Sequence, residues 1–206
     1  GDIVDCMARV NDPLMISIPS NCFAPERINE VFSQLCDNHP GIQFELQISM
    51  DGPKEIHDEI RKVPGLFEKA VATNRMIAES QKTRPNLKIK ITTTFSAFNQ
   101  DTADEFVGYI DNNLTFDRIV LAMAHGACSE ETRAGLDRQK YQGLVPRIDV
   151  INAARGKETE HTLLTKLNLR INNSCNCRAV LERPLAYKKF EKSKAKTSLC
   201  PRARRR

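Results

Sequence analysis

Residues 44–61 read FELQISMDGPKEIHDEIR, and this stretch decides the fold. Apolar and polar residues alternate from Phe44 to Ile48, which predicts a β-strand because successive strand side chains point to opposite faces. The pattern breaks at Asp-Gly-Pro, residues 51–53, which is a strong turn signal. A helix follows the turn. Small polar side chains between the end of a strand and the next helix are where α/β proteins place their chemistry.

Strands and helices alternate on both sides of this stretch. We predict further strands at residues 14–18, 87–95 and 116–123. We predict helices at residues 2–10, from Pro25 to about 38, from about 64 to 80, and from a Thr102-x-x-Glu105 capping box onward. Two later helices are predicted, one from Tyr141 to Ile151 with a kink or early end at Pro146, and one around Leu163, Leu164 and Leu167. This order means a parallel sheet with right-handed crossovers. Four strands do not close a barrel. The sheet is therefore either open or the later part of a barrel whose first strands are missing.

The chain combines a mildly acidic body with a basic tail. It has 206 residues, of which 40% are hydrophobic and 28% are charged, so it can bury a core. Residues 183–206 hold ten Lys or Arg and one acid, Glu191, a net charge of +9, so the other 182 residues carry −4 of the chain's +5. We expect the tail to be disordered and solvated. Nucleic-acid binding by counterion release is the alternative that we favour less.

Cysteine usage and hydropathy indicate a cytoplasmic protein that does not enter a membrane. The seven cysteines are an odd, scattered set, unlike the compact even set of a small secreted disulfide scaffold. We read the Cys175-Asn176-Cys177 group and Cys200 as free thiols of the tail rather than a metal or cluster site. No apolar run approaches the roughly 18 residues that a membrane span needs, and the acidic N-terminus does not resemble a signal peptide.

Four segments, in chain order, resemble motifs of the radical S-adenosylmethionine (radical SAM) enzymes. Residues 19–22, PSNC, resemble a Pro-Thr-Asn-Gly segment after a strand, and residues 49–61 resemble Ser-x-Asp-Gly-Pro followed by His-Asp-x-x-Arg. Residues 63–70, VPGLFEKA, and residues 92–99, TTTFSAFN, resemble the next two family segments. The resemblance covers roughly residues 2–145. It implies an α/β fold, a partial radical SAM-type (β/α) barrel with about four parallel strands retained.

The resemblance implies S-adenosylmethionine (SAM) and a [4Fe–4S] cluster as cofactors, a flavodoxin or ferredoxin as reductant, and radical chemistry on an unknown substrate. In the family, a Cys-x-x-x-Cys-x-x-Cys loop holds the cluster and a Gly-Gly-Glu-Pro segment holds the methionyl amine of SAM, and neither is in this sequence. We therefore expect the cluster ligands upstream of this chain, and we expect the chain alone to be an inactive fragment. Residues 1–170 form the partial barrel domain in this interpretation, and residues 171–206 form the tail.

By the same resemblance, the carboxyl ends of the strands face SAM. The candidate cofactor-binding residues are Ser49, Asp51, Asn21 and Asn99, because small polar side chains there can bind the ribose or the carboxylate. Shaping of the Asp-Gly-Pro turn is the alternative role for Ser49 and Asp51. Turn formation or helix capping is the alternative for Asn21 and Asn99. The sequence predicts no metal ligand, and it identifies no catalytic residue. Cys22 and His125 depart from the family pattern, which usually has Gly and Arg there.

His57, Asp58 and Arg61 form either a proton-transfer set or a structural brace at the start of a helix. We favour the brace, because the 5′-deoxyadenosyl radical abstracts hydrogen in this family and the protein binds and orients.

A second class of function stays open beside the enzyme fragment. The chain is then a non-catalytic binding or scaffold module on a degenerate barrel. In either case, a barrel that lacks its first strands leaves residues 14–18 as an unprotected apolar edge, which pairs readily with other chains.

Overall fold

The structure is a computed structural model, and it describes residues 2–11, 13–124 and 130–155. The chain divides into two units, Gly1–Lys157 and Glu158–Arg206, and every described residue belongs to the first. The predicted helix around Leu163 to Leu167, the boundary at residue 170, the tail, its cysteines and His125 lie outside the described residues. None of the described helices is both long and apolar enough to cross a bilayer.

Four strands form one parallel sheet in the order β1-β2-β3-β4, which is also their order along the chain. The strands are β1 (Met15–Ser20), β2 (Gln43–Ser49), β3 (Leu87–Phe95) and β4 (Arg118–Met123). In a doubly wound sheet the order of the strands reverses at a switch point, and the strand order here has no such reversal. The predicted α/β fold with four parallel strands is therefore confirmed, and closure into a barrel stays a prediction.

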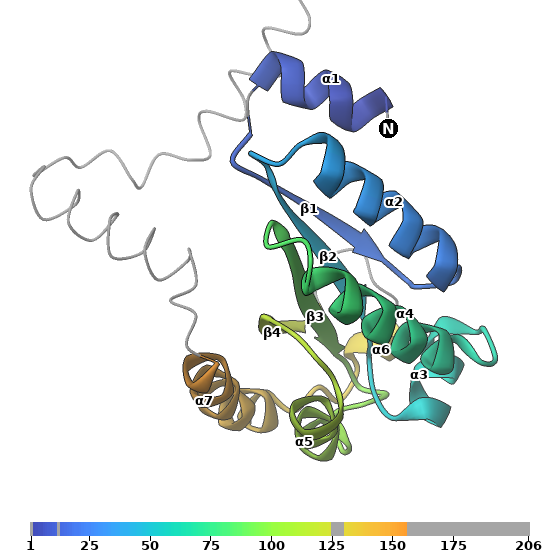
Figure 1. The fold of residues 1–206 in the computed structure, drawn as a ribbon. Helices are drawn as coiled ribbons and strands as arrows, with labels where there is room; N and C mark the ends of the chain where they lie inside the picture. The colour runs from blue at the N-terminus through green and yellow to red at the C-terminus, as the bar shows by residue number, and fades with distance from the viewer. Residues whose placement is uncertain (1, 12, 125–129, 156–206) are drawn as a thin grey trace, which may run out of the picture. The chain divides into compact units, whose positions relative to one another are not determined.

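The helices are α1 (Asp2–Asn11), α2 (Pro25–Asn38), α3 (Lys54–Arg61), α4 (Leu66–Gln81), α5 (Ala103–Asn113), α6 (Glu130–Arg133) and α7 (Arg138–Ala154). The long helices α2, α4, α5 and α7 follow one side of the sheet (Figure 1). Burial agrees with this arrangement, since Ile89 and Ile91 of β3 are fully buried whereas Lys88 and Lys90, which alternate with them, are partly exposed. One face of the sheet is therefore covered by helices, and the other is lined by polar side chains.

The core fills the space between the sheet and these helices. Apolar side chains of β2 and β3 meet those of α4 and α5 there, and the largest are fully buried: Phe44, Leu46, Ile48, Ile89, Ile91, Ile77, Phe106 and Ile110. Burial of apolar surface stabilises by about 25 cal/mol per Å². This core therefore holds the strand ends in fixed positions.

One local prediction is wrong, and a second is wrong in one of its two alternatives. The predicted capping box at Thr102 does not form, because the Thr102 hydroxyl donates to the carbonyl of Asn99 at 3.3 Å instead of capping α5. Pro146 lies inside α7, so the predicted early end at this proline is wrong, and the alternative of a kink stays a prediction. The side-chain amide of Asn152, on the last turns of α7, accepts from Ile119 N at 2.9 Å and donates to Ile119 O at 3.0 Å. This pair of bonds anchors α7 to the outer edge of β4 beyond the proline.

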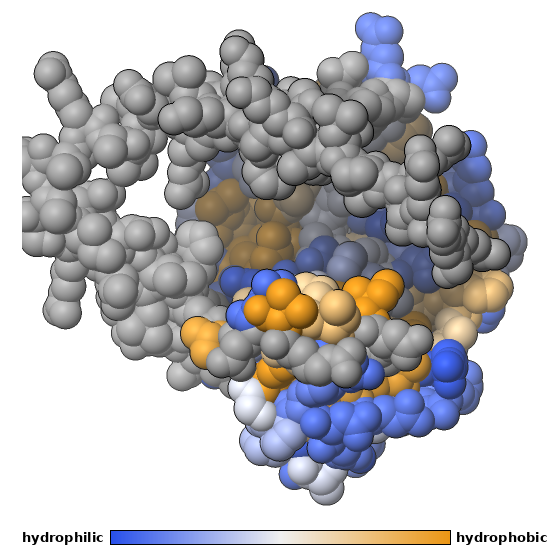
Figure 2. All heavy atoms as spheres, turned by 90° about the horizontal axis from the view of Figure 1, so that it is seen from above, coloured by the Kyte–Doolittle hydropathy of each residue, from blue (hydrophilic) through white to orange (hydrophobic). Residues whose placement is uncertain are grey.

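Helix α1 leaves apolar side chains on the surface. Val4 and Ala8 pack against the core, whereas Ile3 and Val10 are 77% and 73% exposed. Met7 lies between them and is partly exposed. Ile3, Met7 and Val10 line one surface pocket, and orange and paler spheres lie side by side on the face shown in Figure 2.

Candidate functional site

The predicted site residues gather at the carboxyl edge of the sheet. Ser20 pairs with Ile48, Ser49 with Thr92, and Phe95 with Met123 in the strand register, so the four strands end side by side. The loops that follow them carry the other predicted residues. In open parallel sheets and in barrels, this edge is where ligands bind.

Asp51 joins β2, α3 and the end of β3. It is 3% exposed, and its Oδ2 accepts from Arg61 Nε at 2.7 Å and lies 2.6 Å from Arg61 Nη2. Its Oδ1 accepts from Thr94 N at 3.0 Å. Both carboxylate oxygens of Asp51 therefore already have partners within the protein, and the residue acts as a brace between elements.

Asn99 completes the same network from the loop after β3. Its buried amide donates to Asp51 O at 2.5 Å and to Thr94 O at 2.8 Å. Its Oδ1 accepts from Ser96 N at 2.7 Å. Asn99 neither caps α5 nor faces an open surface, so it fixes the geometry of the strand ends.

His57 and Asp58 belong to the brace that the sequence favoured. His57 Nδ1 accepts from Asp51 N at 3.1 Å, which assigns the proton of the neutral ring to Nε2. Burial lowers the pKa of His57 below its usual value, although the charge of Asp51 opposes the shift. His57 Nε2 is buried and has no hydrogen-bond partner among the described residues. No carboxylate is therefore bonded to it as a proton-transfer pair would require.

Asp58 ties α3 to the start of α4. Its carboxylate accepts from Gly65 N at 2.6 Å and from Phe67 N at 2.9 Å. Burial by itself would raise the pKa of Asp58, but these amide donors together bring it below its usual value. The carboxylate satisfies amides at the first turn of α4 that have no partner within the helix.

Ser49 stands apart from this network. As the last residue of β2, it lies on the face that the long helices leave uncovered, in register with Thr92 of β3. The Thr92 hydroxyl is buried and has no hydrogen-bond partner in the described part of the chain. Two adjacent hydroxyl side chains thus mark the carboxyl end of this face.

Asn21 and Cys22 shape the turn after β1. Asn21 is exposed, and its Oδ1 accepts from Phe23 N at 3.2 Å, which forms a local turn. Cys22 has a φ of 62°, in the left-handed region that favours glycine. Both residues therefore serve the local backbone of this turn.

A cleft opens beside the Asp51 network, between α3, the end of β3 and α6. Its volume is about 770 Å³, within the range of small-molecule sites. Apolar and polar side chains line it, among them Ile56, Ile60, Phe98, Arg61, Thr94 and Glu131. The sequence interpretation missed this cleft and the exposed ring of Phe98, which is 53% exposed. An aromatic residue in the loop after a predicted strand was the available signal.

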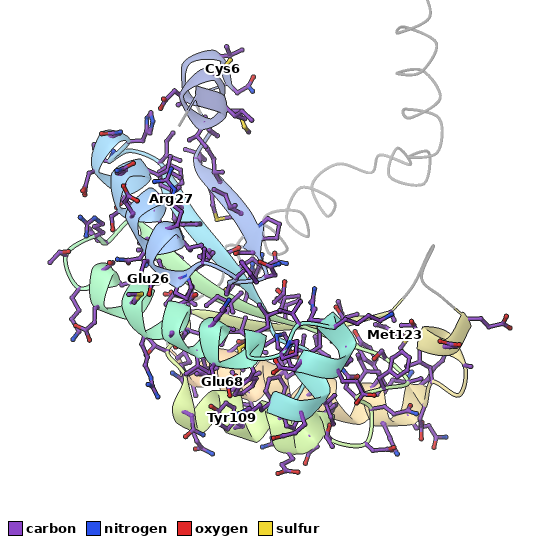
Figure 3. All side chains as sticks on the ribbon, turned by 90° about the vertical axis from the view of Figure 1, so that its right-hand side faces the viewer. Cys6, Glu26, Arg27, Glu68, Tyr109 and Met123 are labelled. Atoms are coloured by element: carbon purple, nitrogen blue, oxygen red, sulfur yellow. The ribbon has the colours of Figure 1, made fainter. Side chains whose placement is uncertain are left out.

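The described residues do not fit an iron–sulfur cluster. Within residues 2–11, 13–124 and 130–155, no three His, Cys, Asp or Glu side chains are placed to hold a metal. Burial raises the pKa of the Cys22 and Cys36 thiols to about 11, which opposes the thiolate form that clusters require. Cys6 lies on α1, remote from Met123 at the carboxyl end of β4 (Figure 3).

No protein-family model matches the chain, and no curated protein matches it significantly.

Proposed function

We propose that this chain is the later, SAM-binding part of a radical SAM barrel and that it is inactive by itself. One observation carries the proposal. The four parallel strands follow one another in chain order, with the long helices on one side and polar side chains at their shared carboxyl edge. A section of a (β/α) barrel has this arrangement, whereas a doubly wound sheet has helices on both faces.

Within this proposal, the predicted site residues divide into two roles. Ser49 lies on the uncovered face at the end of β2, and its hydroxyl binds the ribose or the carboxylate of SAM. Asp51 and Asn99 position the strand ends, because their polar atoms are already bonded to Arg61, Thr94 and Ser96. Asn21 shapes the turn that follows β1 at the same edge of the sheet.

The cluster supplies the electron that cleaves SAM in this family, with a flavodoxin or ferredoxin as the source. The sequence has no Cys-x-x-x-Cys-x-x-Cys segment, and the residues that the structure describes do not fit a cluster, so we propose that its ligands lie upstream of this chain. The contribution of this chain is to bind and orient SAM and a substrate of unknown identity.

The test is a titration of the ¹⁵N-labelled chain with SAM, followed by amide chemical shifts. We expect saturable shifts at Ser49 and its neighbours and not at α2. Ser49→Ala should weaken binding by roughly 2- to 10-fold, the value of one hydrogen bond. Ser80→Ala is the matched control, since Ser80 bonds Asn29 between the outer helices. The absence of saturable shifts overturns SAM binding, and formation of 5′-deoxyadenosine by the isolated chain overturns the inactive-fragment proposal.

The second candidate is a non-catalytic scaffold module, which the exposed apolar stripe on α1 favours. Contiguous apolar surface marks sites of protein–protein contact. Ile3, Met7 and Val10 form such a surface. This candidate predicts no response to SAM in the same titration.

A further inference from the structure

A row of polar and charged side chains crosses the face of the sheet that the long helices leave uncovered. Glu45 of β2 stands at its centre, with Lys90 Nζ 2.6 Å from Oε1 and Arg118 Nη2 3.4 Å from Oε2. Ser17 of β1 donates to Glu45 Oε1 at 2.7 Å and accepts from Lys90 Nζ at 3.2 Å. The row therefore takes one side chain from each of the four strands.

The charges in this row do not balance. Two cations, Lys90 and Arg118, share the single carboxylate of Glu45. The side chain of Glu45 is 8% exposed, and those of Lys90 and Arg118 are 12% and 25% exposed. The neighbouring cation of β3, Lys88, lies on the same face and has its own carboxylate, Asp117, at 3.9 Å. Two partly buried cations thus share one carboxylate, and partly buried charges favour partners of opposite sign.

A second observation on the same face points to a ligand. Thr92 lies two residues beyond Lys90 on β3, so both side chains point to the same side of the sheet. The Thr92 hydroxyl is buried and has no hydrogen-bond partner within the described residues. A buried hydroxyl without a partner costs free energy. An anionic oxygen bound at this face would neutralise the excess charge and give the hydroxyl an acceptor.

We propose that this face binds the carboxylate or phosphate group of a small anionic ligand, through Lys90 and Arg118 as charged donors and Thr92 as a neutral donor. Arg and Lys are the residues that bind these groups, and bonds between charged partners are the stronger ones. Glu45 has a defined role here, because it orients the two cations and competes with the ligand for them. The inference goes beyond the proposed function, since it needs neither SAM nor a cluster.

The test is a titration of the ¹⁵N-labelled full chain at low salt with inorganic phosphate and, separately, with succinate. We expect saturable amide shifts at Glu45, Lys90 and Arg118 for at least one of the two, and the tighter ligand identifies the chemical class. Lys90→Gln should weaken binding about 10-fold, as expected for the loss of one charged hydrogen bond. Glu45→Gln should strengthen it, because the competing carboxylate is gone.

Lys82→Gln is the matched control, since Lys82 is an exposed lysine paired with Glu79 on α4. It should leave the affinity unchanged. Arg118→Gln replaces Lys90→Gln if that variant loses the parent spectrum. The proposal is overturned if Lys82→Gln and Lys90→Gln lose the same affinity, or if a folded Glu45→Gln variant binds more weakly than the parent. It is also overturned if no amide on β2, β3 and β4 shows a saturable shift. The SAM titration of the parent chain is independent of these results.

Discussion

The side-chain amide of Asn99 donates to the main-chain carbonyl of Asp51 at 2.5 Å, although 48 residues separate them. The same amide donates to Thr94 O at 2.8 Å. One side chain thus ties the loop after β2 to the end of β3, at the edge where the candidate site lies. The geometry of that edge therefore depends on Asn99, although Asn99 itself does not face an open surface.

Replacement of Asn99 by alanine should destabilise the protein by at least about 2 kcal/mol, because each buried polar group left without a partner costs roughly 1–3 kcal/mol. The carbonyls of Asp51 and Thr94 and the amide of Ser96 all lose a bond. Urea unfolding measures the change. Asn113→Ala is the control, since Asn113 is exposed on α5 and makes one bond to Tyr109 O. Equal changes in the two variants would refute the role assigned to Asn99.

Gly52 is in close contact with the helix that follows it. A Cβ added there would lie 2.9 Å from Ile56 Cγ2 and 3.3 Å from Ile56 Cβ. Gly52→Ala should therefore cost about 1–3 kcal/mol by overpacking. Gly41→Ala, where a Cβ meets nothing within 4 Å, should be neutral or slightly stabilising in the same unfolding measurement.

Ile56→Ala tests the cause of that cost. It removes Cγ2, the atom nearest to the added Cβ, so the double variant should be more stable than the sum of the two single changes predicts. Strict additivity would show that the cost of Gly52→Ala arises elsewhere.

His57 should make stability depend on pH in a defined window. Burial chiefly lowers its pKa in the folded protein, whereas the unfolded chain returns to about 6.5. Below pH 6.5 the unfolded state binds a proton that the folded state does not bind. The free energy of unfolding therefore falls as the pH decreases from 6.5 toward the folded pKa, and this contribution is level above 6.5.

Comparison of the parent with His57→Gln isolates this effect. Between pH 7 and pH 5 the parent should lose more stability than the variant, with an added slope of at most about 1.4 kcal/mol per pH unit for one proton. The lowered pKa of Asp58 acts below about pH 3.8, outside the window, and is common to both proteins. Parallel curves in urea unfolding would contradict the prediction.

The alternation of apolar and polar residues was sufficient to predict the strands of the sheet, but not to predict where each strand begins and ends. The alternation of residues 87–95 predicted β3 with its observed bounds, because both sides of that strand have a distinct environment. The strand predicted at 14–18 instead runs from Met15 to Ser20. Its last residues pair with β2 through backbone hydrogen bonds, and the pattern of side chains does not predict such pairing. The short helix α6 was missed, since four residues carry no period.

The candidate site was predictable in place and only partly in role. Strand ends located Asp51 and Asn99 correctly, but their bonds join segments 43 and 48 residues apart, which no local pattern encodes. The row around Glu45 shows the same limit. Alternation indicated that Glu45 and Lys90 lie on polar faces, whereas their pairing with Arg118 depends on the register of three strands.

The apolar stripe of α1 and the edge of β1 should together make the chain self-associate. Within the described sheet, β1 pairs with β2 alone, and Leu14 and Met15 at its start are exposed. Unpaired strand edges bind other chains. Val10→Lys places a charge on the stripe at a residue that is 73% exposed, so the fold should be unaffected while association weakens. Sedimentation velocity over a range of concentrations measures it. Val150→Lys is the control, since Val150 is 68% exposed on α7, away from the stripe. A parent chain that stays monomeric at every concentration, or equal effects of both substitutions, would show that neither the stripe nor the edge is an interface.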